Sequence, residues 1–154
     1  MKADWEIKTL GEVCVMDKKQ GIHKNLPYVG LENIESNTGQ FLGSIDSIEV
    51  KSSTFKFSPE HLLYGRLRPY LNKVMLPDFS GHCSIEIFPI KPNPELLREF
   101  LQYWFFKEDT VEQINATRTG ARMPRANINE VIDFEFLLPH SSNKNASPTS
   151  WQCY

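Results

Sequence analysis

The sequence has few cysteines, and none of them has the spacing of a metal site. The chain of 154 residues contains three: Cys14, Cys83 and Cys153, with no C-x-x-C pair. An odd number of widely separated cysteines argues against a zinc cluster and for reduced thiols in a cytoplasmic protein. His23 has no partner at ligand spacing either, so we expect neither a metal nor a cofactor.

Long apolar runs are also absent. A membrane-spanning helix needs about 18 or more consecutive apolar residues, and no stretch comes near this length. The opening MKADWEIKTL carries scattered charges without an apolar region, so we expect no signal peptide and no membrane partner. Hydrophobic residues make up 40% of the chain and charged residues 23%, which is typical of a globular domain.

An excess of positive charge is missing as well. The net charge is −2, which does not by itself indicate nucleic-acid binding. The charges are segregated, however, since residues 64–75, 117–129 and 18–24 contain cations and no acid, while acids gather at 32–49 and 95–112. An acidic protein with this pattern can present one positive face, although the same charges could simply be solvated.

The sequence LLYGRLRPYLNKVM, residues 62–75, places cations at a turn between two apolar runs. Gly65 and Pro69 define the turn, and the cations in it suit contacts to phosphates and base edges. The alternative is a crossover whose arginines face solvent. Tyr70 and Asn72, in the same turn, are expected to be structural.

The sequence ATRTGARMPRANINEV, residues 116–131, predicts a second basic loop around Gly120 and Pro124. Arginine can make bidentate contacts to guanine or phosphate, and no acid nearby in the sequence would neutralise this cluster. A connector with solvated arginines is equally compatible. The candidate DNA-contacting residues from all basic segments are Arg66, Arg68, Lys73, Arg118, Arg122, Arg125, Lys18, Lys19 and Lys24.

The element pattern predicts an α+β fold. Five or six short strands separated by Gly, Pro, Ser and Asn favour a twisted, mostly antiparallel sheet or partial barrel. One of these strands is expected over residues 26–34, and residues 5–15 contain a strand start or a helical turn. Apolar spacing predicts one long helix at 94–108, capped by Asn93 with Pro94 first and Glu95 in its first turn. Shorter helices at 110–116 and 127–131 and a last strand at 134–139 complete one domain, residues 1–139, while residues 140–154 read as a disordered tail.

Catalysis finds little support in the sequence. His82, Cys83 and Glu86 lie close together in GHCSIE, which raises the hypothesis of a small cysteine hydrolase. On a strand, His82 and Cys83 would point to opposite faces, and a small buried cysteine is the better interpretation. No phosphate-binding loop and no methyltransferase cofactor motif is present.

The segments WEIKTLGEVC, PYVGLENIE, LLYGRLRPYLNKV, GHCSIEIFPIKP and TGARMPRANINEVIDFEFLLP occur in this order between Trp5 and Pro139. Together they resemble the target recognition domain of type I restriction–modification specificity subunits. The resemblance implies a non-catalytic component that binds double-stranded DNA and recognises half of a split site for partner methyltransferase and restriction subunits. We expect the spacer helix and the second recognition domain of that family to be absent from this chain. A module that docks a methyltransferase subunit without binding DNA is therefore the alternative.

Overall fold

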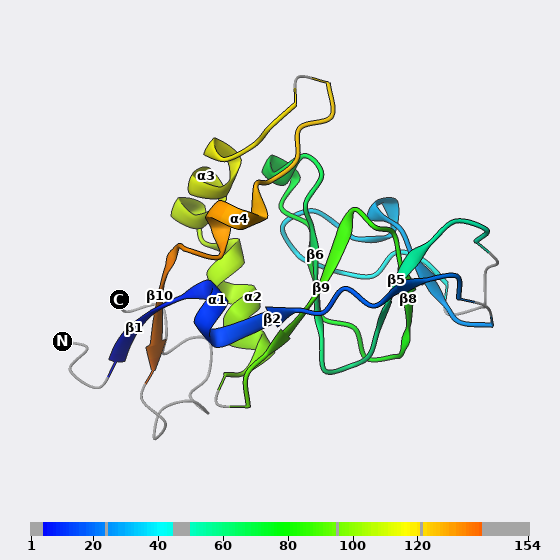
Figure 1. The fold of residues 1–154 in the computed structure, drawn as a ribbon, viewed down its shortest axis with the longest axis horizontal. Coiled ribbons are helices and arrows are strands. Elements are labelled where there is room, and N and C mark those ends of the chain that lie inside the picture. Colours follow the sequence, from blue (N-terminus) through cyan, green and yellow to red (C-terminus); the bar gives the residue numbers. More distant parts are fainter. Residues whose placement is uncertain (1–4, 24, 45–49, 95, 121, 140–154) are drawn as a thin grey trace.

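The computed structural model describes residues 5–23, 25–44, 50–94, 96–120 and 122–139. Lys24, Glu95 and the predicted tail at 140–154 lie outside these ranges. At one end of the molecule (Figure 1), β1 (Trp5–Thr9) and β10 (Glu135–Pro139) form an antiparallel two-stranded sheet. Strand β10 confirms the predicted last strand, which ends at Pro139 as expected and begins one residue later, at Glu135.

Two four-stranded sheets form the rest of the β structure. The first is antiparallel, in the order β2 (Cys14–Met16), β9 (Ile87–Pro92), β6 (Leu62–Gly65) and β7 (Val74–Met75). The second has the order β3 (Gln20–Gly21), β5 (Thr54–Phe57), β8 (Gly81–Cys83) and β4 (Tyr28–Val29), and β4 and β8 are its parallel pair. The predicted α+β class with mostly antiparallel strands is confirmed.

The helices are α1 (Leu10–Val13), α2 (Arg98–Phe106), α3 (Glu108–Ala116) and α4 (Ile128–Val131). Helix α2 packs against β6, β7 and β9 of the first sheet, and α3 packs against α2. The apolar residues of α2 whose spacing predicts the helix, Phe100, Leu101, Trp104 and Phe105, are buried. The ring of Phe105 stacks on Tyr64 of β6 at a centroid distance of 4.7 Å. This aromatic packing fixes α2 on the strand that leads into the candidate site.

The predicted start of the long helix is wrong, because α2 begins at Arg98 rather than Pro94. Asn93 is engaged elsewhere: its backbone N–H donates to Val13 O at 2.9 Å and its Nδ2 donates to Glu12 O at 2.9 Å. Its side chain therefore ties β9 to α1 instead of capping a helix. The extended backbone of Lys107 (φ −61°, ψ 135°) ends α2 and lets α3 begin at Glu108 instead of residue 110.

The strand predicted at 26–34 is also shorter than expected. Only Tyr28 and Val29 pair as β4, and η1 (Leu31–Asn33), a 3₁₀ turn, follows. The side chain of Asn33 accepts the backbone N–H of Gly30 at 2.8 Å, and such local bonding competes with a strand ladder. The predicted short helix near residue 127 is confirmed as α4, whose cap Asn127 accepts from Asn129 N.

No helix within the described ranges is long and apolar enough to cross a membrane.

Candidate nucleic-acid interface

The two basic segments predicted from sequence lie side by side. The backbone N–H of Ala126 donates to Arg66 O at 2.8 Å, and that of Arg68 donates to Pro124 O at 2.6 Å. In Figure 1 the loop between α3 and α4 extends outward next to η2 (Pro69–Leu71). Residues that are more than 50 positions apart in sequence therefore form one surface.

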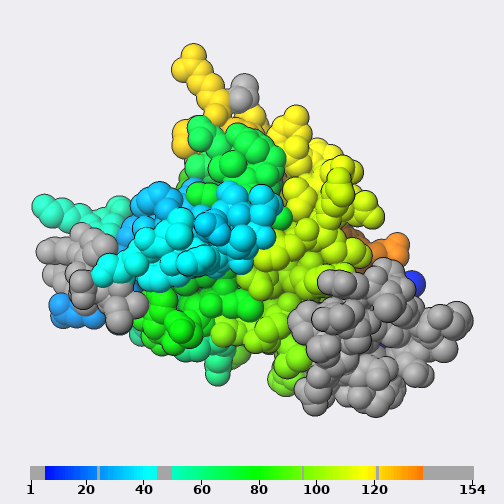
Figure 2. All heavy atoms as spheres, turned by 180° about the vertical axis from the view of Figure 1, so that it is seen from behind, coloured from blue at the N-terminus to red at the C-terminus, as the bar shows by residue number. Residues whose placement is uncertain are grey.

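The loop between α3 and α4 is a hairpin. Thr119 and Arg125 exchange backbone hydrogen bonds of 3.0 and 2.9 Å, and Gly120 adopts φ 93°, which favours glycine. Viewed from behind, the loop (yellow) stands out from the surface beside the green segment that follows β6, as Figure 2 shows. Arg118 and Arg122 are exposed on it. The Arg118 guanidinium donates to Asn115 O at 2.8 Å, in the last turn of α3.

Arg68 and Asn72 frame η2 in left-handed backbone conformations. Their φ values are both 51°, which is unusual for residues other than glycine and costs roughly 1–2 kcal/mol. Asn72 is buried and donates from Nδ2 to Asn37 Oδ1 at 3.2 Å, so its predicted structural role is confirmed. Arg68, in contrast, is exposed. Its strained backbone is held by the hydrogen bond to Pro124, so the two loops fix each other.

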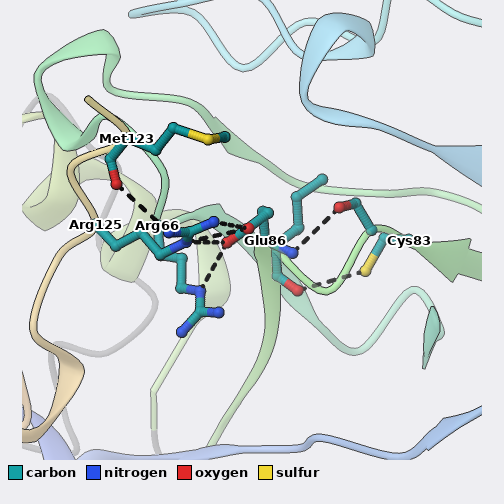
Figure 3. Close-up of polar contacts among 7 residues, drawn as sticks. Arg66, Cys83, Glu86, Met123 and Arg125 are labelled. Atoms are coloured by element: carbon teal, nitrogen blue, oxygen red, sulfur yellow. Dashed lines mark hydrogen bonds and ion pairs between the residues drawn. The ribbon is translucent and has the colours of Figure 1, made fainter. Parts of the chain in front are cut away.

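Glu86, at the turn before β9, lies between two of the predicted arginines (Figure 3). Arg66 Nε donates to its Oε1 at 3.1 Å, and Arg125 Nε donates to Oε1 and Oε2 at 2.9 and 3.1 Å. The expectation that no acid would neutralise the arginine cluster is therefore wrong. Hydrogen bonds from Arg125, followed by the nearby charge of Arg66, lower the pKa of Glu86, so its carboxylate stays ionised.

Phe88 brings a third basic segment to the same site. The ring centroid lies 4.8 Å from Lys18 Nζ and 5.0 Å from Arg66 Cζ, distances at which cation–π attraction operates. Phe88 is itself buried in β9. Neither Glu86 nor Phe88 was predicted, because both belong to a strand-like stretch in which nothing indicates contacts to residues 18, 66 and 125.

The other predicted cations take different positions. Lys73 is half-buried, donates from Nζ to Leu31 O at 2.7 Å, and lines a cleft of about 240 Å³ together with Arg68. Lys19 lies away from the arginines, in a second cleft that also contains Lys56. Lys24 lies outside the described residues. The structure thus gathers Lys18, Arg66, Arg68 and Arg125 at one site, with Arg118 and Arg122 on the projecting loop.

The geometry does not favour a nucleophilic cysteine. Cys83 is fully buried in β8, and desolvation raises the pKa of its thiol, which disfavours the reactive thiolate. Its predicted burial is confirmed. His82 is buried as well, with Nδ1 2.8 Å from Thr54 Oγ1.

Asp17, His61 and Ser58 are connected in an order that resembles a serine-hydrolase triad. His61 Nε2 lies 2.9 Å from Asp17 Oδ2, and Ser58 Oγ lies 3.2 Å from His61 Nδ1. The backbone N–H of Ser58 already donates to Nδ1 at 3.0 Å, however, which occupies the lone pair that a general base would use. The group therefore anchors the β5–β6 turn. Across the described part of the chain, no three metal-binding side chains come together.

No protein-family model matches the sequence. The chain is 26% identical over 119 residues to the type I restriction enzyme EcoDI specificity subunit of Escherichia coli, an alignment covering 76% of this chain and 26% of that subunit. It superposes with a TM-score of 0.71 on the HsdS subunit from Thermoanaerobacter tengcongensis, at 20% identity over 92% of this chain and 39% of that one. The chain also superposes with a TM-score of 0.71 on a chain from a structure that describes complex assembly and conformational transition of the type I R-M system. The identity is 22%, over 89% of this chain and 38% of that one. The chain thus spans well under half the length of these relatives.

Proposed function

We propose that this chain, a homologue of the type I restriction–modification specificity subunits with the fold of their target recognition domain, binds double-stranded DNA and recognises its sequence. In this role it performs no chemistry. It recognises one half of a bipartite site in the cytoplasm, on behalf of partner methyltransferase and restriction subunits.

The observation that carries this proposal is the joining of two arginine-bearing loops by backbone hydrogen bonds. Arg68 is exposed at this junction and Arg122 on the projecting loop, and within the described ranges neither forms an ion pair with a carboxylate. Exposed guanidiniums on a folded scaffold suit the bidentate geometry of phosphate oxygens and of guanine edges. Because backbone hydrogen bonds tie the two loops together, the loops that carry these groups are already paired before DNA arrives.

The arginines divide into two sets. Arg66 and Arg125 share Glu86, so their charge is partly neutralised and they position the two loops. Arg68, Arg118 and Arg122 are exposed and supply the contacts, with Lys18 beside Phe88 adding charge at the margin. Phosphate contacts set the register of the protein on the duplex, whereas base-edge contacts by the loop give specificity.

The experiment is fluorescence-anisotropy binding to a random duplex pool at two salt concentrations, followed by sequencing of the retained duplexes. Enrichment of a short motif, with affinity that falls steeply as salt rises, is the expected result. Arg122→Ala should reduce the slope of log affinity against log salt by about 0.9 for one lost phosphate contact. Lys8→Ala, in β1 at the opposite end of the molecule from β5, is the charge-matched control. An Arg122→Ala slope equal to wild type would contradict the assignment.

A second candidate function is docking to a methyltransferase subunit without DNA binding. The exposed Ile7 (68%) on β1 and the exposed Val15 (60%) on β2 favour protein contacts at these two strands. Absence of duplex binding at low salt, together with salt-insensitive binding to a purified methyltransferase subunit, would select this function instead.

A further inference from the structure

We infer that a second cleft, defined by Lys19, Lys56, Lys91, Ser58 and Ser80, is a phosphate-binding site. The cleft has a volume of about 230 Å³, several times the roughly 30 Å³ that one water molecule occupies in the liquid, so a phosphate group fits. The inference rests on the proposed function in one respect. When the chain binds double-stranded DNA, the phosphate in the cleft is a phosphate of the DNA backbone.

Lys19, the residue before β3, stands opposite Lys56 of β5. The β3–β5 register pairs Gln20 with Phe55, and the backbone N–H of Lys56 donates to Lys19 O at 3.2 Å, which extends the pairing by one residue. Both side chains are exposed at the cleft. Like charges directly opposite each other destabilise a sheet pair, and an anion between them removes this repulsion.

The acids of the cleft are already engaged. Asp17 accepts from His61 Nε2 at 2.9 Å, and Glu60 pairs with Lys91 at 3.1 Å. Among the described residues no carboxylate forms an ion pair with Lys19 or Lys56. Two ammonium groups are therefore available, in contrast to Arg66 and Arg125, which share one carboxylate.

The cleft is connected to the arginine site through consecutive residues. Lys18 contacts Phe88 beside Arg66, while the next residue, Lys19, lines the cleft. The backbone N–H of Asp17 donates to Pro89 O at 2.8 Å, which fixes this segment along β9. A nucleic-acid backbone that meets the arginines can thus be contacted a second time by lysines held on the same strand-bound segment.

The test has two arms. In the first, inorganic phosphate is titrated into the ¹⁵N-labelled chain, and the amide signals of Ser58, Lys56 and Ser80 should shift. The Lys19→Ala/Lys56→Ala double variant should abolish these shifts. Absence of shifts in the wild-type chain, or shifts of equal size in the double variant, would overturn the site.

In the second arm, duplex affinity is measured as a function of salt. Because both lysines face one phosphate, the double variant should lower the salt slope by about 0.9, rather than by twice that amount. Lys8→Ala, which removes one cation from β1, is the control, and thermal melting checks that each variant is folded. If the wild-type chain binds inorganic phosphate but the salt slope of the double variant equals that of the control, the DNA backbone is not the source of the phosphate. Free phosphate is then the ligand of the cleft. Phosphate binding with no duplex binding by the wild type would overturn the proposed function while supporting the site.

Discussion

Arg125 donates from Nε to both carboxylate oxygens of Glu86, at 2.9 and 3.1 Å. Arg66 approaches the same carboxylate from the end of β6. One acid from the turn before β9 thereby connects the two basic loops, and their backbones are hydrogen-bonded beside it. Substitution of Glu86 should therefore distinguish two influences on DNA binding, the position of the two loops and their positive charge.

Glu86→Gln should lower stability and at the same time change how DNA is bound. The pair is only partly buried, so we expect a loss of about 1 kcal/mol after allowance for solvent screening. Thermal melting should show this loss as a fall in Tm of roughly 2–4 °C for a domain of this size. Arg66 and Arg125 would lose a charged partner, so affinity for random duplex should rise while preference for the selected motif weakens.

Glu135→Gln, an exposed substitution on β10 at the β1–β10 end of the molecule, makes the same change in charge away from the loops and is the control. Comparison of motif and random duplexes for both variants distinguishes positioning from net charge. If both variants raise random-duplex affinity equally and keep the motif preference, Glu86 does not position the loops.

The lowered pKa of Glu86 predicts a particular dependence of stability on pH. Its folded-state pKa lies below the ordinary value of 4.5, so the ionised carboxylate stabilises the fold at pH values above 4.5. This contribution is lost as pH falls from 4.5 through the folded-state pKa. Urea unfolding of wild type and Glu86→Gln should therefore differ by a constant free energy between about pH 5 and 7 and converge in more acidic solution. A difference that stays constant down to pH 3 would contradict the linkage.

The parts of the fold that could be predicted from sequence are those with local signals. The apolar spacing of α2 is set by residues three and four apart, and Phe100, Leu101, Trp104 and Phe105 are indeed buried. The predicted cap failed because Asn93 bonds to α1, about 80 residues earlier, and no local pattern contains that contact. The strand predicted at 26–34 failed because the Asn33 side chain closes a 3₁₀ turn after β4.

The candidate site was predictable to a similar extent. Each arginine segment is visible as a run without acids, and glycine and proline mark both as loops. That the two loops pair is a result of the long-range backbone bonds between residues 66–68 and 124–126. Glu86 could not be assigned, because in sequence it lies 20 residues from Arg66 and 39 from Arg125.

Burial of Cys83 predicts that its thiol is unreactive in the native protein. Cys14 is also buried, and desolvation raises its pKa to about 12. In a Cys153→Ser background, Ellman's reagent at pH 8 should therefore label neither thiol in the folded chain and both in denaturant. Rapid stoichiometric labelling of Cys83 in the folded state would instead revive the cysteine-hydrolase hypothesis.

Arg68 offers a way to separate fold stability from DNA binding, because its backbone is strained while its side chain is exposed. Glycine accepts φ 51° without the Cβ penalty, so Arg68→Gly should be more stable than Arg68→Ala by about 1 kcal/mol. Both variants lose the guanidinium, and each should lower the salt slope of duplex binding by about 0.9. Urea unfolding and anisotropy on the same samples test both effects. Equal stability of the two variants would contradict the backbone strain, whereas wild-type salt slopes in both would remove Arg68 from the interface.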